Sequence, residues 1–118
     1  MSVLCNLIGT PYFPNSLRGA LLFLEDTGEH PGSILRMFNQ LIMSGLLKNA
    51  SGLLFGNFGE NLDLTPLLFE MSQRVSLPIY TSNDFGHVSP NFPLMIGAQA
   101  NIKGHQLHWS YKRSYEPR

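Results

Sequence analysis

Short apolar runs separated by longer mixed segments dominate the first two thirds of the chain. The runs 20–24 and 52–56 hold only apolar residues and glycine and lie between polar segments, a pattern typical of short buried strands. The segment 78–81, Pro-Ile-Tyr-Thr, predicts a third short strand. The pattern therefore predicts a sheet that contains at least these three strands.

Two amphipathic segments lie between the predicted strands. In 34–42 and again in 64–75, apolar residues recur every three or four positions, which predicts two helices that each bury one face. Pro31 is expected to open the first helix, and Gly45 lies near its expected end. Thr65-Pro66 predicts an N-cap and first turn for the second helix.

The order of these elements predicts the fold class. Two strand–helix–strand units in series indicate a mainly parallel sheet, because parallel neighbours need a crossover connection and helices supply it. The last part differs: 94–102 and 106–111 are separated by Lys103-Gly104-His105, which predicts an antiparallel hairpin. We therefore expect an α/β domain with a mainly parallel sheet, flanking helices and a C-terminal β-hairpin.

Composition and charge narrow the class of protein. A chain of 118 residues is a typical single domain. Eight Lys plus Arg balance eight Asp plus Glu, which does not favour nucleic-acid binding. Charged residues make up 14% of the chain and apolar residues 43%, a low charge for a fully solvated surface. This excess of apolar over charged residues predicts a face that packs against a partner.

The cysteine count and the hydropathy of the chain indicate its cellular compartment. Cys5 is the only cysteine, so the chain forms no internal disulfide and contains no Cys-Xaa-Xaa-Cys motif for zinc or redox chemistry. No stretch approaches the ~18 apolar residues needed to span a bilayer. We expect a soluble, cytoplasmic protein that interacts with neither membranes nor nucleic acids.

Glu25 is the first candidate for chemistry. It directly follows the predicted strand 20–24, and in parallel α/β sheets the loops beyond the carboxyl ends of strands form the ligand crevice. Asp26 and Glu29 follow it as weaker candidates. The alternative is that Glu25 caps the next helix or lies in a solvated loop.

His87 is the second candidate. It follows the third predicted strand in the segment Asn83-Asp84-Phe85-Gly86-His87, where Gly86 allows close backbone approach. A loop histidine can serve as a general base near neutral pH. The alternative is a surface histidine, or one packed against Phe85.

Other kinds of site are less well supported. A metal site from Glu25, His30 and His87 would have to be assembled from separate loops, since no compact ligand motif is present. His105 and His108 fall in the predicted hairpin, away from the expected crevice. The glycines fit neither a phosphate loop nor a dinucleotide fingerprint, so we expect no cofactor and no metal. Gly-Xaa-Ser-Xaa-Gly, which presents a nucleophilic serine, is also absent.

Several segments occur in the order found in one known family. They are 7–12, 19–29, 36–37 with 40–41 and 45–46, 52–58, 78–80, 85–87 and 93–98. In this order they resemble the C-terminal domain of bacterial serine LD-carboxypeptidases, which include muramoyl-tetrapeptide carboxypeptidases and microcin C immunity proteins. The resemblance covers nearly the whole chain and implies a swivelling β/β/α domain.

The resemblance also implies roles for the two candidates. Glu25 matches the triad glutamate of the Leu-Glu-Asp motif, and His87 matches the histidine of the Gly-His motif, 62 positions further on. The family divides a Ser-Glu-His triad between two domains. The resemblance thus implies that the serine belongs to an N-terminal domain absent from 1–118, and that this chain alone is inactive.

The substrate and partners implied by the resemblance remain expectations. Family members remove the terminal D-alanine from murein tetrapeptides during cell-wall recycling, whereas the immunity relatives cleave a peptide antibiotic. A binding domain that kept the fold without the chemistry is a further alternative. Tyr12, Phe85 and Asn91 are candidate substrate contacts, although packing is the simpler role for the two aromatic residues. We also expect a homodimer through the apolar face.

Overall fold

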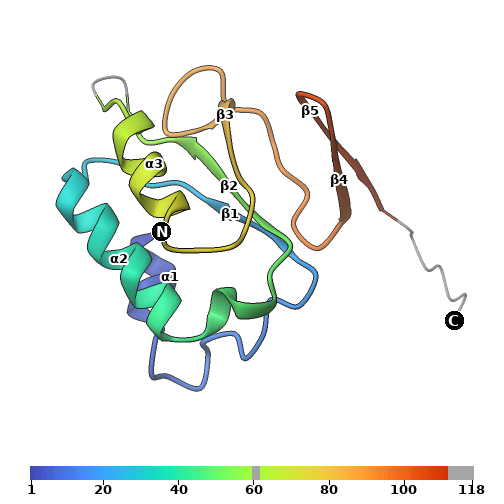
Figure 1. Cartoon of the computed structure of the whole chain (residues 1–118). Coiled ribbons are helices and arrows are strands. Elements are labelled where there is room, and N and C mark those ends of the chain that lie inside the picture. Colours follow the sequence, from blue (N-terminus) through green and yellow to red (C-terminus); the bar gives the residue numbers. More distant parts are fainter. Residues whose placement is uncertain (60–61, 112–118) are drawn as a thin grey trace, which may run out of the picture.

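The computed structural model describes residues 1–59 and 62–111. Helices α1, α2 and α3 lie on one side of a sheet formed by β1, β2 and β3, and the hairpin of β4 and β5 lies on the other side (Figure 1). The elements in chain order are α1 (Ser2–Asn6), β1 (Leu21–Leu24), α2 (Pro31–Met43), the 3-10 helix η1 (Leu46–Asn49), β2 (Gly52–Asn57), α3 (Thr65–Ser72), β3 (Ile79–Gly86), β4 (Gln99–Lys103) and β5 (Gln106–Ser110).

The sheet has the order β1-β2-β3, and both strand pairs are parallel. The helices α2 and α3 make the two crossovers, as the alternation of patterns predicted. Strands β4 and β5 pair antiparallel, with Ile102 opposite Leu107. The α/β class, the parallel sheet and the C-terminal hairpin are therefore confirmed.

The core lies between the helices and the sheet. Leu53 and Phe55 of β2 are fully buried, and the ring of Phe55 lies 6.5 Å from that of Phe38 on α2. Strand β2 is the central strand and is covered on both faces, which explains its continuous apolar sequence. The amphipathic face of α2 fills this core with Ile34, Met37, Phe38 and Leu41.

A register shift between β2 and β3 determines where β3 ends. Phe55 pairs with Thr81, but Asn57, two residues later, pairs with Gly86, five residues after Thr81. The extra residues of β3 bulge out of the ladder. Gly86 has φ +125°, and a Cβ there would lie 2.8 Å from the backbone nitrogen of Asn57, so glycine is required at this position.

Three of the boundaries that differ from the sequence expectation have a clear physical cause. Strand β3 continues to Gly86 rather than ending at position 81, because the bulge carries it further along β2. Strand β4 begins at Gln99 rather than at 94, because the chain turns first: the amide of Ala98 donates to the carbonyl of Met95, and Gly97 has φ +82°.

The third difference concerns the start of α3. The prediction that Thr65 caps this helix was wrong, because Thr65 is its first helical residue. Its amide donates to Oδ1 of Asp63 at 2.9 Å, so the acceptor comes from two residues earlier in the chain. This exposed carboxylate has a lowered pKa because it accepts that hydrogen bond.

Within residues 1–59 and 62–111, no helix combines the length and the apolar character that crossing a bilayer requires.

Candidate active site

Glu25 lies immediately after β1, at the carboxyl end of the sheet. The backbone there is held from outside the strand, because the Met1 nitrogen donates to the carbonyl oxygen of Glu25 at 2.5 Å. The Glu25 side chain is 35% exposed, so its carboxylate lies at the edge of the core with access to solvent. This is the crevice position predicted for it.

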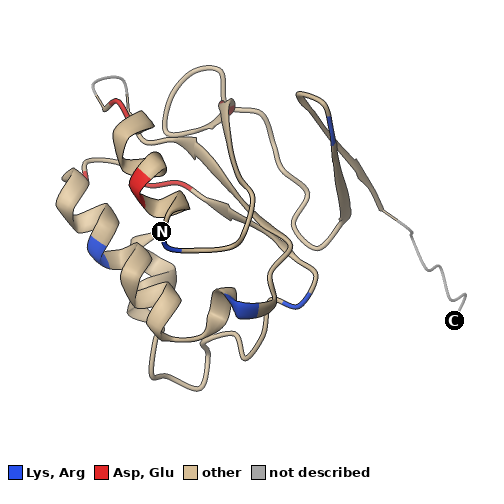
Figure 2. Cartoon of the chain, viewed as in Figure 1, with Lys and Arg blue, Asp and Glu red and all other residues tan. Residues whose placement is uncertain are grey.

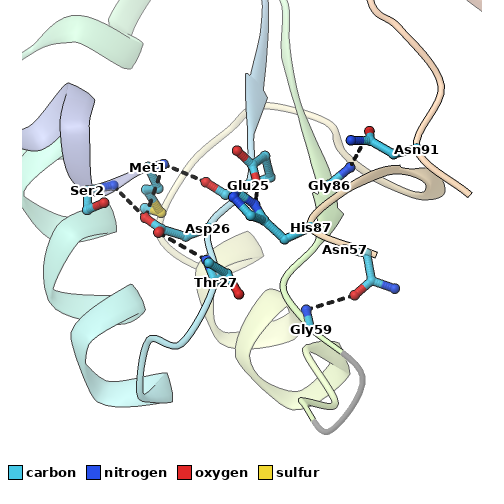
Figure 3. Close-up of polar contacts among 10 residues, drawn as sticks. All are labelled: Met1, Ser2, Glu25, Asp26, Thr27, Asn57, Gly59, Gly86, His87 and Asn91. Carbon is cyan, nitrogen blue, oxygen red and sulfur yellow. Dashed lines mark hydrogen bonds and ion pairs between the residues drawn. The ribbon is translucent and has the colours of Figure 1, made fainter. Parts of the chain in front are cut away.

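His87 lies immediately after β3, at the same end of the sheet. Its Nδ1 contacts Oε2 of Glu25, although the two residues are 62 positions apart in the chain (Figure 3). The imidazole remains 54% exposed. Within the described residues, its Nε2 makes no hydrogen bond. The pair therefore has one imidazole nitrogen engaged by the carboxylate and the other available for a reacting group.

Asp26 anchors the loop that carries Glu25. Its Oδ2 accepts from the Ser2 amide at 2.6 Å and lies 3.2 Å from the Met1 ammonium, and its Oδ1 accepts from the Thr27 amide at 3.0 Å (Figure 3). Burial disfavours the charged form, but these hydrogen bonds outweigh it and lower the pKa of Asp26 to about 2. Asp26 thus joins the end of β1 to the start of α1.

The loop after β3 is tied back to that strand by two hydrogen bonds. The amide of Gly86 donates to Oδ1 of Asn91 at 3.3 Å, and the amide of Phe92 donates to the carbonyl of Asp84 at 2.7 Å. Phe85, which precedes Gly86, is 5% exposed, and its ring centroid lies 5.9 Å from that of Phe23 with the two rings tilted by 46°. His87 is therefore held between a packed aromatic residue and a loop that is bonded back to β3.

An open pocket of about 780 Å³ surrounds the pair. Glu25, His87, Phe85 and Asn91 all line it, together with residues of the loop 88–94. Tyr12, the remaining predicted contact, lines neither this pocket nor the larger cavity of the domain, and it is 81% exposed. The structure thus gathers four of the five candidate residues at one place.

His30 and Cys5, which were considered for metal or redox chemistry, both lie outside the pocket. Nδ1 of His30 accepts from the amide of Gly32 at 3.1 Å, so His30 caps the N-terminus of α2. Cys5 is buried, and burial raises the pKa of its thiol. Across residues 1–59 and 62–111, no group of three or more His, Cys, Asp or Glu side chains is placed to hold a metal ion.

Comparison with known proteins identifies the family. The sequence profile described as the LD-carboxypeptidase C-terminal domain matches residues 1–102. The chain belongs to this family. The resemblance carried by the ordered segments is therefore confirmed, and the family is one of carboxypeptidases, which are hydrolases.

Relatives of this LD-carboxypeptidase domain agree in sequence and fold. A probable murein peptide carboxypeptidase of Bacillus subtilis is 37% identical over 108 residues, which cover 85% of this chain and 34% of that protein. The crystal structure of a muramoyltetrapeptide carboxypeptidase from Oxalobacter formigenes superposes with a TM-score of 0.78 at 33% identity, covering 90% of this chain and 40% of the other.

A more distant relative is the microcin C7 self-immunity protein MccF of Escherichia coli. It is 23% identical over 108 residues, covering 86% of this chain and 31% of MccF. Its ligand-free structure has a TM-score of 0.62 at 21% identity, covering 76% and 29% of the two chains, which shows a shared fold. The LD-carboxypeptidase domain thus spans about a third of the length of the relatives it matches.

Sequence reasoning gave Asp26 too little weight in this LD-carboxypeptidase domain. The signal that could have raised it lies in α1: Val3, Leu4, Leu7 and Ile8 have helical spacing, and the N-cap residue Met1 makes no side-chain cap hydrogen bond. The first N–H groups of a helix require partners, and a carboxylate is a favourable one. Asp26 supplies it from 24 residues away.

Proposed function

We propose that this domain supplies the glutamate and histidine of a Ser-Glu-His triad in a serine-type LD-carboxypeptidase. The observation that carries the proposal is the contact between Nδ1 of His87 and Oε2 of Glu25 beside an open pocket. The nucleophilic serine and the oxyanion hole would come from an N-terminal domain outside the 118 residues of this chain. The domain would then be the C-terminal half of a two-domain enzyme.

Each side chain has a defined task in this mechanism. The Glu25 carboxylate accepts the Nδ1–H of His87, which leaves Nε2 unprotonated and directs the ring. Nε2 takes the proton of the serine hydroxyl as its oxygen attacks the carbonyl carbon, and then gives that proton to the leaving amine. Glu25 stabilises the imidazolium that exists between these two transfers. Water then releases the acyl group by the same sequence of proton transfers.

Murein peptides are the proposed substrates, with the terminal D-alanine as the leaving group. Two relatives at 37% and 33% identity have names that specify murein peptide and muramoyltetrapeptide, which supports this choice. Cleavage of a peptide antibiotic is the second candidate, supported by the likeness to MccF. A binding domain without chemistry is less well supported, because Glu25 and His87 lie in contact in a pocket.

The first test measures the imidazole tautomer by ¹⁵N NMR in the isolated chain. A hydrogen bond to Glu25 should hold the proton of neutral His87 on Nδ1. Glu25→Gln should shift it towards Nε2, which is the commoner position in a free imidazole. Glu29→Gln is the matched control, because Glu29 is a partly buried carboxylate four residues away. An unchanged His87 tautomer in Glu25→Gln would contradict the proposed role.

The second test measures hydrolysis in a hybrid enzyme. This chain replaces the matching C-terminal segment of the Bacillus subtilis relative, and release of D-alanine from a murein tetrapeptide is followed. We expect Glu25→Gln and His87→Ala each to lower kcat by about three orders of magnitude or more, with Glu29→Gln close to wild type.

The isolated chain provides a further check on where the nucleophile resides. We expect it to release no D-alanine above background. Ser89 is the only serine among the residues that line the pocket. Hydrolysis by the isolated chain that is lost in Ser89→Ala would overturn the two-domain proposal. The expected homodimer remains a prediction, which light scattering over a range of concentrations would test.

A further inference from the structure

A second and larger cavity, of about 850 Å³, lies between the sheet and the hairpin. Leu54 of β2 and Tyr80 of β3 pair in the sheet and form its floor. Leu107 and Trp109 lie two residues apart on β5 and share a face, and Ile102 pairs with Leu107 from β4. All three of these hairpin residues line the cavity, so it lies between two β-layers and is open to solvent.

The larger cavity combines aromatic walls with a few polar groups. Tyr80, Phe92 and Trp109 contribute aromatic rings, and Phe92 and Trp109 remain 57% and 42% exposed. The side chains of the lining that can hydrogen-bond include Thr81, Ser82, Asp84, His105, Gln106 and His108. Small-molecule sites are typically ~300–1,000 Å³, mostly apolar, with a small number of polar groups that orient the ligand. Volume and lining both fall within that description.

The charge of the lining favours a neutral ligand. Among the residues that line this cavity, Asp84 is the only one with a formal charge at neutral pH, apart from the histidines, and none is Lys or Arg. In Figure 2 the strands near the cavity are mostly tan; the exceptions include Asp84 on β3 and Lys103 on β4, and Lys103 does not line the cavity. An anionic ligand would need cationic partners here, because an unpaired charge is costly to desolvate.

The two cavities share a wall. Phe85, Phe92, Pro93 and Leu94 line both the larger cavity and the pocket around His87. The hydrogen bond from the Phe92 amide to Asp84 holds this wall against β3. A ligand whose reacting end lies beside His87 can therefore continue across Phe92 into the larger cavity.

We propose that the larger cavity binds a neutral pyranose, such as an N-acetylated amino sugar, by stacking against Trp109 and Phe92. A pyranose presents an apolar C–H face that packs on an aromatic ring, while its hydroxyl and acetamido groups bond to polar side chains. Asp84 would accept from sugar hydroxyls, and His105 would donate or accept. The further assignment of this sugar to the glycan end of a murein fragment rests on the proposed function.

A stem peptide fits the lining less well than a sugar. Its free carboxylates would meet Asp84 and find no Lys or Arg among the lining residues. The observations therefore favour the sugar, and the peptide becomes an outcome of the test.

The full chain allows a direct binding measurement, because Trp109 is its only tryptophan. N-acetylglucosamine is titrated while Trp109 fluorescence and the imidazole resonances are recorded. We expect a saturable fluorescence change with a Kd on the order of 1–10 mM, as for a small ligand with few contacts. The His105 resonances should shift with the same Kd, whereas those of His30, which caps α2 and does not line the cavity, should not move.

Two other ligands distinguish ring stacking from general binding of hydroxyl groups and from peptide binding. Sorbitol carries hydroxyl groups but no apolar ring face, and we expect no saturable response to it. The tripeptide L-Ala-D-Glu-L-Lys represents the stem peptide. Saturation by the tripeptide without a response to the sugar would overturn the proposal in favour of a peptide site. Equal responses to the sugar and to sorbitol would overturn it as well.

Variants locate the binding site. We expect Trp109→Ala to weaken the sugar response of His105 at least tenfold and Trp109→Phe to retain most of it. Tyr111→Ala is the matched control, because Tyr111 is a 64% exposed aromatic residue that does not line the cavity. Unchanged affinity in Trp109→Ala would overturn the proposal. Should Trp109→Ala fail to fold, Asp84→Asn provides the test instead. Asp84 is exposed, and its replacement should weaken sugar binding less than the loss of Trp109 does.

These measurements involve neither the serine nor hydrolysis. Sugar binding can therefore fail while the hybrid enzyme still releases D-alanine, and it can succeed while that enzyme is inactive. The two proposals are overturned by different results.

Discussion

Nδ1 of His87 contacts Oε2 of Glu25 across the end of β2, although the two residues follow strands that are not neighbours in the sheet. The contact spans β2 because β3 bulges and because the backbone of Gly86 packs directly on that of Asn57. The catalytic geometry proposed here therefore depends on a glycine and on the hydrogen bonds of two loops.

Replacing Gly86 by alanine should destabilise the domain strongly. A Cβ would collide with the backbone of Asn57, and φ +125° is a conformation that other residues rarely adopt. We expect the free energy of unfolding to fall by about 3 kcal/mol, measured by urea denaturation.

Gly97→Ala is the matched control for this change. Gly97 also has positive φ, +82°, but a Cβ there has nothing within 4 Å. Its cost should be about 1 kcal/mol, the conformational part alone. Equal losses in the two variants would show that backbone contact with Asn57 does not matter.

Replacing Asp26 by asparagine should reduce stability in a pH-dependent manner. The folded-state pKa of Asp26, about 2, is below its ordinary value of 3.8, so the charged form stabilises the folded state. That contribution, on the order of 2 kcal/mol, is complete above pH ~4 and is lost as pH falls towards about 2.

The pH dependence of unfolding tests this linkage for Asp26. The difference in unfolding free energy between wild type and Asp26→Asn should be largest at neutral pH and shrink between pH ~4 and ~2. Asp63→Asn is a suitable comparison, because Asp63 also accepts from the first amide of a helix but is fully exposed. A difference for Asp26 that is constant with pH would contradict the interpretation.

Asn91→Ala should loosen the loop that follows His87 with little effect on overall stability. The variant removes the acceptor of the Gly86 amide, and at 3.3 Å this is a long hydrogen bond worth about 0.5–1 kcal/mol. The Gly86 amide should then exchange with solvent about two- to fivefold faster, as measured by NMR. Asn83→Ala, at an exposed position of β3, should leave that exchange rate unchanged.

Phe38→Ala should be among the most damaging core substitutions. Phe38 is fully buried against Phe55, so truncation leaves a cavity and should cost about 3–5 kcal/mol in thermal or urea unfolding. Phe69→Ala on α3 provides the control, because Phe69 is 69% exposed and should change stability by less than about 0.5 kcal/mol. Similar losses at both sites would contradict the assignment of the core.

The elements could be predicted where local pattern determines them. The continuous apolar run of β2 and the amphipathic spacing of α2 depend on burial, which a sequence records directly. The ends of β3 and β4 could not be predicted, because the bulge opposite Asn57 and the turn before Gln99 depend on which backbone groups meet in space.

The candidate site, like the fold, could be predicted from the sequence only in part. By itself, the sequence determined that an acidic residue and a histidine follow two strands of a parallel sheet, which placed Glu25 and His87 at one end of it. Only the tertiary structure decided that they touch, that Asp26 anchors the loop of Glu25 to α1, and that Tyr12 lies elsewhere. The physical reason is that strand order and burial follow from local apolar patterning, whereas contacts between side chains depend on register, loop closure and hydrogen bonds between residues distant in sequence.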